Sequence, residues 1–134
     1  MDGLPDIHDG YFDGLCVSSQ KSVHLFLRTD RGERSTIVLK GVEAMNLSNF
    51  LPGNIIFDIV VAGSEKLTIG DIEQLYQHEP TQAQTEQLFR KVQQQGLSIL
   101  YITPSYGAQC AVLFQAAEIS PDYVLPEHTT PVST

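Results

Sequence analysis

The feature that most constrains the fold is a pair of alternating segments joined by a short polar loop. In VHLFLRT (23–29) and STIVLKGV (35–42), apolar side chains recur at every second position, and most positions between them are polar. A period of two is typical of β-strands with one buried face and one wet face. Between the segments, DRGE (30–33) suits a hairpin loop in which Gly32 takes a positive φ. The two segments therefore predict an antiparallel hairpin.

Other segments extend this hairpin to a sheet. The stretch 11–19 has strand composition, and 55–62 is apolar on both faces except for Asp58, which predicts a central strand covered on both sides. Two later segments, 97–103 and 108–119, are separated by a turn and predict a second hairpin. We therefore expect about six strands in a curved, mostly antiparallel sheet.

The stretch EAMNLSNFLPGN (43–54) interrupts the strand pattern. It is rich in turn-forming residues and has Pro52-Gly53 near its end. Its apolar side chains indicate a connection that is ordered. The sequence therefore predicts a structured link between the third and fourth strands.

Two helices are predicted after the fourth strand. Thr68 with Asp71, and Thr81 with Gln84, have the spacing of capping boxes at two helix starts. Gly96 follows the second helix as its C-terminal cap. The predicted fold class is therefore α+β, with a two-helix insertion between strands 4 and 5 of the sheet.

Length and composition indicate one domain, because 134 residues with 42% hydrophobic content suffice for a single core. We expect this domain to span residues 1–119 and a Pro-containing, largely flexible tail to span residues 120–134, in which at most Tyr123-Val124-Leu125 docks on the domain. In the first helix, Ile69 is expected on the apolar face. The periodic inner faces predict seven buried residues: Leu25, Leu27, Ile37, Leu39, Ile72, Leu75 and Phe114.

The net charge of −8 is unevenly distributed along the chain. All Lys and Arg residues lie between Lys21 and Lys91, so nucleic acid is not expected as a partner, because phosphate binding needs clustered cations.

No apolar run has the roughly 20 residues of a membrane helix, and no secretory signal is recognisable, so we expect a cytoplasmic protein. Cys16 and Cys110 fit no zinc or redox spacing and are expected to be free thiols, with a disulfide as the alternative.

The acids that have no base near them in sequence are candidates for a partner-binding surface. The first set lies near the N-terminus: Asp2, Asp6, Asp9 and Asp13. The second set lies near the C-terminus: Glu118, Asp122 and Glu127. Such a surface favours a basic protein partner, because interface charges steer the encounter. The alternative is that the negative charge only keeps the domain soluble.

The stretch DIHDGYFDG (6–14) raises the question of a metal site, because imidazole and carboxylate groups such as His8, Asp9 and Asp13 suit divalent cations. Asp9-Gly10 is also a turn signal. In such a turn Asp9 accepts backbone N–H bonds, Gly10 takes a positive φ, and His8 bonds to backbone at the start of the strand. We expect the turn, with no metal and no cofactor, since P-loop, HExxH, CxxC and GxSxG patterns are absent from the sequence.

Three polar residues are candidates for a pocket or polar site: His8, His24 and Asp58. A carboxylate within an apolar strand is costly to bury without a partner, so Asp58 is either a perturbed functional acid or ion-pairs with Arg28 or Lys40 across the sheet. Cys16 and His24 lie on adjacent predicted strands, but the acids near Cys16 disfavour a thiolate. We therefore predict no catalytic residues and a non-enzymatic protein.

Two stretches of the sequence resemble a group of small bacterial domains: Ile7-His8-Asp9-Gly10 before the first strand, and LKGVEAMNLSNFLPGNIIFDI (39–59). The shared signature is His-Asp followed by a small residue, and later a GV…N-F…GN-I-I segment. Some of these domains are uncharacterised, and others are classed with the immunity proteins of polymorphic toxin systems. The resemblance covers residues 7–62 and implies an inhibitor of a toxin, with no catalytic residues.

Three functional hypotheses follow from the sequence. The first is a protein-binding domain, of which an immunity-type inhibitor is a specific form. The second is a small-molecule-binding domain or enzyme with a pocket between sheet and helices, using Asp58, His24 or the tyrosines. The third is a homo-oligomeric adaptor that acts as a homodimer.

Overall fold

A computed structural model describes residue 4 and residues 6–126 of the chain. Eight strands, each antiparallel to its neighbours, form one sheet in the order β4-β7-β6-β5-β1-β2-β3-β8. The strands are β1 (Tyr11–Val17), β2 (Val23–Arg28), β3 (Arg34–Lys40), β4 (Ala44–Ser48), β5 (Asn54–Ala62), β6 (Ser98–Tyr106), β7 (Gln109–Phe114) and β8 (Ala116–Pro121). The helices are α1 (Ile69–Glu73) and α2 (Gln82–Gln95). Neither helix of this described part is long and apolar enough to cross a membrane.

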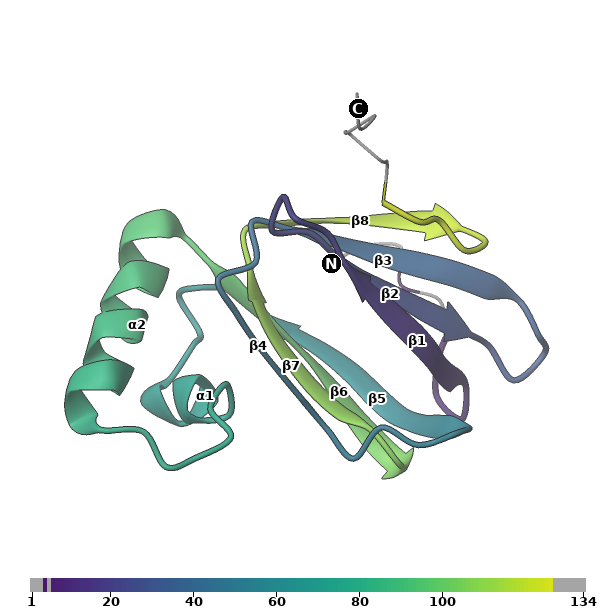
Figure 1. Cartoon of the computed structure of the whole chain (residues 1–134), viewed down its shortest axis with the longest axis horizontal. Coiled ribbons are helices and arrows are strands. Elements are labelled where there is room, and N and C mark those ends of the chain that lie inside the picture. Colours follow the sequence, from purple (N-terminus) through teal and green to yellow (C-terminus); the bar gives the residue numbers. More distant parts are fainter. Residues whose placement is uncertain (1–3, 5, 127–134) are drawn as a thin grey trace, which may run out of the picture.

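The sheet curls over, and its two halves enclose the main core (Figure 1). One half consists of β4, β7, β6 and β5, and the other of β1, β2, β3 and β8. The chain passes between the halves through residues 41–43 after β3 and through Gln115 after β7. The two links lie side by side, because Gln115 N–H donates to Lys40 O at 2.9 Å. Gly41 has a φ of 63° at this corner, and a Cβ there would lie 2.7 Å from Cβ of Gln115, so the corner requires glycine.

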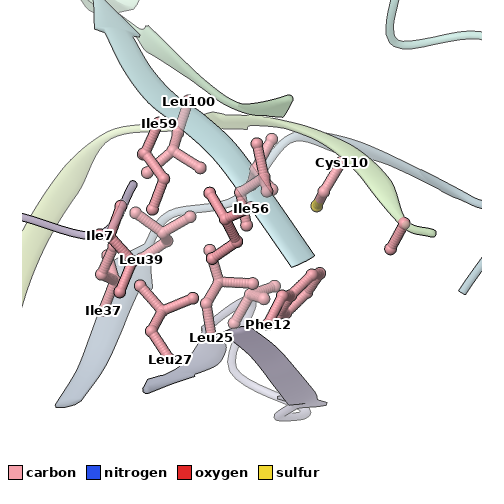
Figure 2. Packing of buried hydrophobic residues seen from close by; sticks show 14 of the residues in the cluster. Ile7, Phe12, Leu25, Leu27, Ile37, Leu39, Ile56, Ile59, Leu100 and Cys110 are labelled. Atoms are coloured by element: carbon pink, nitrogen blue, oxygen red, sulfur yellow. The ribbon is translucent and has the colours of Figure 1, made fainter. Parts of the chain in front are cut away.

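Aliphatic side chains from both halves fill the space between them (Figure 2). Leu25 of β2 and Ile37 of β3 face Ile56 of β5 and Leu100 of β6, and all four are fully buried. Of these, Leu25 and Ile37 are inner positions that the period of two predicts. All seven core residues expected from the sequence are buried: Leu25, Leu27, Ile37, Leu39, Ile72, Leu75 and Phe114.

A second apolar cluster lies between the helices and the outer face of β6 and β7. Ile72 of α1 and Val92 of α2 are fully buried in it together with Ile99 and Leu113. Figure 1 shows both helices on this one side of the molecule. Ile69 was expected on the apolar face of the first helix, but it lies in the first turn of a five-residue helix and is 41% exposed.

The local signals of the sequence are present as predicted. Gly32 has a φ of 91° in the hairpin loop. Thr68 and Thr81 each form a complete capping box, and Gly96 ends α2 in the left-handed conformation. These motifs depend on a few neighbouring residues, and so the sequence is sufficient to locate them.

The prediction of about six strands, with the helices between strands 4 and 5, is wrong in two places. Residues 44–48, expected in the ordered connection, form β4 and pair with β7. Met45 and Leu47 pack against the main core from this strand, so pairing and burial override the turn tendency of its polar residues. The stretch 108–119 is divided at Gln115 into β7 and β8, which pair with different halves of the sheet. The helices therefore lie between β5 and β6 of an eight-stranded sheet.

The chain continues past β8 across the outer face of β2 and β3. β8 runs through Pro121, so the expected boundary between domain and tail, at residue 120, falls inside a strand. Asp122 has a φ of 61° and is followed by four further described residues. We call Asp122–Pro126 the C-terminal strap. The remainder of the expected tail, residues 127–134, lies outside the described residues.

Candidate functional site

The turn at residues 8–10 forms, but its residues have different roles from those expected. Asp9, and not Gly10, takes the left-handed conformation, with a φ of 63°. Gly10 is buried, and a Cβ at this position would lie 2.7 Å from the carbonyl oxygen of Arg28. Glycine is therefore required here for close backbone approach, and the prediction of its positive φ is wrong.

His8 makes the expected bond to backbone, and its partner lies on β5. Its Nδ1–H donates to the carbonyl oxygen of Phe57 at 2.6 Å, and its ring packs against the Phe57 ring with 5.3 Å between centroids. The bond to Phe57, followed by the nearby charge of Asp9, raises the pKa of His8 above its ordinary value. Asp6, and not Asp9, accepts a backbone N–H in this turn, from His8 at 3.3 Å.

A β-bulge turns Phe57 out of the core. The pairing of β5 with β6 shifts register between Ile56 and Asp58. Ile56 is fully buried and Ile59 is nearly so, whereas Phe57 is 51% exposed and Asp58 is exposed beside it. Val60, the next outward residue, is also half-exposed. The prediction that this segment is covered on both sides is therefore wrong along this part of β5, because the helices cover only the other end of the sheet.

Asp58 does not form either of the ion pairs expected for it. Its Oδ1 accepts the neighbouring backbone N–H at 2.9 Å. Arg28 binds Asp13 with 2.9 Å between Nε and Oδ2, and Lys40 binds Glu118 with 2.6 Å between Nζ and Oε1. The carboxylate of Asp58 is thus exposed and available to a ligand or partner.

These residues form one surface, which we call the Phe57 patch: Asp6, His8, Asp9, Phe57 and Asp58. The charges of Asp6, Asp9 and Asp58 all act to raise the pKa of His8, and Asp9 lies nearest, with 3.6 Å between its Oδ2 and His8 Nε2. No Lys or Arg among the described residues forms an ion pair with any of the three. The sequence-based candidates Asp6, His8, Asp9 and Asp58 therefore meet at one place, and Phe57 is the member that the sequence analysis missed.

A cavity of about 340 Å³ opens beside the patch. It lies between the N-terminal segment and the loop that joins β2 to β3, and six residues line it: Asp6, His8, Thr29, Asp30, Arg31 and Glu33. Three carboxylates face one guanidinium, so the cavity has a net negative lining. In the sequence, Asp30 and Glu33 indicated only a turn. Their proximity to Asp6 depends on the tertiary fold, so the sequence did not identify them as site residues.

Asp13 is not part of the patch. The sequence grouped it with the N-terminal acids that have no base near them, but in the structure it has a basic neighbour. Arg28 binds its carboxylate through Nε and Nη2, and the Tyr123 hydroxyl donates to the same group. Partial burial acts to raise the pKa of Asp13, but the bonds from Arg28 and Tyr123 outweigh it and hold this pKa below the ordinary value. The Arg28 guanidinium also stacks over the Tyr11 ring, 4.2 Å from its centroid.

His24 lies on the other half of the sheet, under the C-terminal strap. It is 6% exposed, and its Nδ1–H donates to the carbonyl oxygen of Val124 at 2.6 Å. A cavity of about 400 Å³ opens here between the strap and β2, β3 and β8, with Lys40 and Glu118 also in its lining. His8, His24 and Asp58 therefore do not form one site. Cys16 pairs with His24 in the strand register, and it is a half-buried free thiol.

A third cavity of about 400 Å³ lies between the edge of β4 and the segment that follows α1. Asn46 of β4 donates to the carbonyl oxygen of Gln74 at 3.0 Å, while its Oδ1 is buried with no hydrogen-bond partner. Tyr76 and His78 contribute to the lining. This is the nearest equivalent of the expected pocket between sheet and helices, but neither Asp58 nor His24 reaches it.

The remaining candidates are dispersed. Glu118 is paired with Lys40, and the Oδ1 of Asp122 accepts the N–H of Tyr123. Asp2 and Glu127 lie outside the described residues. No group of three or more His, Cys, Asp or Glu residues in the described ranges is arranged to hold a metal ion.

Both cysteines are free, as expected, and Cys110 lies fully buried in the main core, where burial raises its pKa to about 12.

Three comparisons with known proteins gave no match. No family model matches the chain, and neither the curated proteins nor the solved structures contain a significant match.

Proposed function

We propose that this protein is a non-enzymatic protein-binding domain that recognises a basic partner through the Phe57 patch. The observation that carries the proposal is the half-exposed Phe57 ring, which packs against His8. Near His8 are three acids that have no Lys or Arg partner in the described chain. Aromatic residues are enriched at the centres of protein interfaces, and polar residues form the rim around them.

The apolar and charged parts of the patch have different roles in this proposal. Burial of the Phe57 ring by a partner supplies affinity, and aromatic residues of this kind are frequent binding hot spots. The ring is already fixed by its contact with His8, so little conformational entropy is lost on binding. Asp6, Asp9 and Asp58 supply long-range attraction, which raises the association rate with a basic surface.

The acidic cavity beside the patch supports a basic partner in particular. Its lining combines Asp6, Asp30 and Glu33 with one cation, Arg31. A Lys or Arg side chain of the partner gains charge-assisted hydrogen bonds in such a cavity while an apolar neighbour covers Phe57. The patch and cavity thus accept a basic residue next to an apolar one.

Inhibition of a toxin is the specific form of binding that the resemblance of residues 7–62 to immunity proteins implies. An inhibitor of this kind needs a rigid, charged surface and no catalytic centre. We propose the cytoplasm as its location. The Phe57 patch lies mostly within the segment that carries the resemblance.

The test is affinity capture with the full chain as bait, using cells that carry the natural gene. Phe57→Ala is compared with wild type and with Ile69→Ala, a control that removes an exposed apolar side chain from α1. We expect wild type and I69A to capture the same partner, and F57A to bind it at least about 30-fold more weakly, the effect of a hot spot of about 2 kcal/mol. Equal capture by all three baits would exclude the patch as the interface.

Charge steering is tested on the captured partner. Asp6→Asn with Asp58→Asn should slow association, and the effect should shrink between about 0.01 M and 0.1 M salt, where the Debye length falls from about 30 to about 10 Å. The matched control replaces two acids distant from the patch, Glu65→Gln with Glu86→Gln. If the partner is a toxin, co-expression of wild type should restore growth and co-expression of F57A should not.

A second candidate, small-molecule binding, has support from the cavity beside β4. The lining of this cavity is polar, and the Oδ1 of Asn46 is buried there with no hydrogen-bond partner. A ligand with a hydrogen-bond donor could bind this oxygen. A metabolite that raises the melting temperature of wild type but not of Asn46→Leu, with no protein captured by any bait, would favour this function over the first.

A further inference from the structure

The C-terminal strap is held on the sheet chiefly through its main chain. Thr36 of β3 donates its hydroxyl to the carbonyl oxygen of Asp122 at 2.8 Å and accepts the N–H of Val124 at 2.9 Å. His24 of β2 donates to the carbonyl oxygen of Val124 at 2.6 Å. Two side chains of the sheet thus bind three main-chain groups of the strap, one on Asp122 and two on Val124. This is how a protein binds a peptide segment of variable sequence.

One side chain anchors the strap. The Tyr123 ring packs against Phe26 with 5.3 Å between centroids, and the Arg34 guanidinium lies 5.2 Å from the centroid of the same ring. Its hydroxyl donates to Asp13. Burial, followed by this bond, raises the pKa of Tyr123 to about 12, so the hydroxyl remains a donor at neutral pH.

The rest of the strap buries little apolar surface. Val124 is 39% exposed and Leu125 is 69% exposed, so hydrophobic burial contributes little to their retention. Beneath the strap, Thr36 is fully buried and His24 nearly so, although both are polar residues on the outer face of a sheet. Both side chains can hydrogen-bond to water when the strap leaves, which keeps the uncovered face compatible with solvent.

We infer that this face of β2 and β3 is an acceptor site for an extended peptide segment of a partner protein, and that the strap is its displaceable resident. The segment has an aromatic residue with a hydroxyl group, which enters the socket of Phe26, Arg34 and Asp13, and a following residue whose N–H and C=O bind Thr36 and His24. This site lies on the other half of the sheet from the Phe57 patch and does not depend on the function proposed above.

The sequence of the strap itself supplies a probe. A blocked synthetic peptide with residues 121–126, PDYVLP, is titrated into isotopically labelled full-length protein, and backbone amide shifts are followed by NMR. Tyr123→Ala removes the anchor of the resident strap and exposes the site. If the strap covers the site in about nine-tenths of the wild-type molecules, only about one-tenth can bind the peptide. The apparent dissociation constant is the intrinsic one divided by this fraction, so the variant should bind the peptide about tenfold more tightly than wild type. The shifts should map to β2 and β3.

Two further variants control the experiment. The double variant Tyr123→Ala with Thr36→Val keeps the volume of residue 36 but removes both hydrogen bonds from this residue to the peptide. The double variant should not bind the peptide. Tyr106→Ala removes an exposed tyrosine distant from the strap and should bind the peptide as wild type does.

Two results would overturn the inference. The first is the absence of peptide-induced shifts on β2 and β3 in a folded Tyr123→Ala. The second is equal affinity of wild type and Tyr123→Ala. If Tyr123→Ala does not fold, Tyr123→Phe decides the question, because it loses only the bond to Asp13 and should bind more tightly than wild type by a smaller factor.

Discussion

The two halves of the sheet bury different numbers of faces. In β6 and β7, consecutive residues such as Ile99 and Leu100, or Val112 and Leu113, are all fully buried, because the core covers one face and the helices cover the other. In β2 and β3 the core covers only the inner face, and the outer face carries polar residues such as Thr36 under the strap. The comparison teaches that both proposed recognition surfaces lie where helix cover is absent, at the outer face of β2 and β3 and at the bulge of β5.

The largest expected effect tests the core that both halves share. Leu25→Ala removes a fully buried side chain between them, and it should lower the free energy of unfolding by about 2–5 kcal/mol. Chemical denaturation of both proteins measures the difference. A loss below about 0.5 kcal/mol would mean that the inner and outer faces of β2 are reversed.

The next effect tests the second cover on β6 and β7. Ile72→Ala removes a fully buried contact between α1 and these strands, and we expect a loss near the lower end of the range of about 2–5 kcal/mol, because a five-residue helix can move to fill part of the cavity. Denaturation curves give the value, and Ile69→Ala on the exposed side of α1 is the control. A loss equal to that of the control would show that the helices do not stabilise this half of the sheet.

A smaller effect tests the polar outer face of the other half. Asp13→Asn weakens the bonds to Arg28 and Tyr123 and should lower stability by less than about 1 kcal/mol at neutral pH, since the pair is partly exposed. The folded-state pKa of Asp13 lies below its ordinary value, so its contribution is present above that value and is lost as pH falls through the folded pKa. Wild type and variant should therefore converge in acid denaturation below about pH 4. A constant difference down to pH 2 would contradict this origin.

The smallest effect concerns the Phe57 patch. The folded-state pKa of His8 is raised, so its charged form contributes stability below the unfolded pKa of about 6.5, and this contribution is lost as pH rises through the folded value. Melting temperatures of wild type and His8→Gln, compared at pH 5.5 and 8.5, should differ more at the lower pH. A larger difference at the higher pH would show that the imidazole acts only through its neutral form.

Local signals in the sequence were sufficient for much of the fold. The alternation in 23–29 and 35–42, the glycine of the hairpin loop and both capping boxes each depend on residues close in sequence, and all are present. The strand at 44–48 was missed, because its polar residues have turn propensity and only its pairing with β7 stabilises it as a strand.

The candidate site was only partly predictable, because it depends on contacts between distant segments. The sequence identified Asp6, His8, Asp9 and Asp58 as separate candidates, and tertiary structure brings the three acids near His8, whose ring packs against Phe57. It grouped Asp13 with the unpaired acids, although Arg28 of the next strand binds it.

The sequence by itself thus determined the inner faces, the caps and the hairpin loop, since hydrophobic periodicity and turn chemistry act over a few residues. Tertiary structure alone decided the bulge that exposes Phe57, the acids that lie near His8, and the place on β2 and β3 where the strap docks. Each of these depends on the register between segments that are far apart in sequence, which a period of two does not specify.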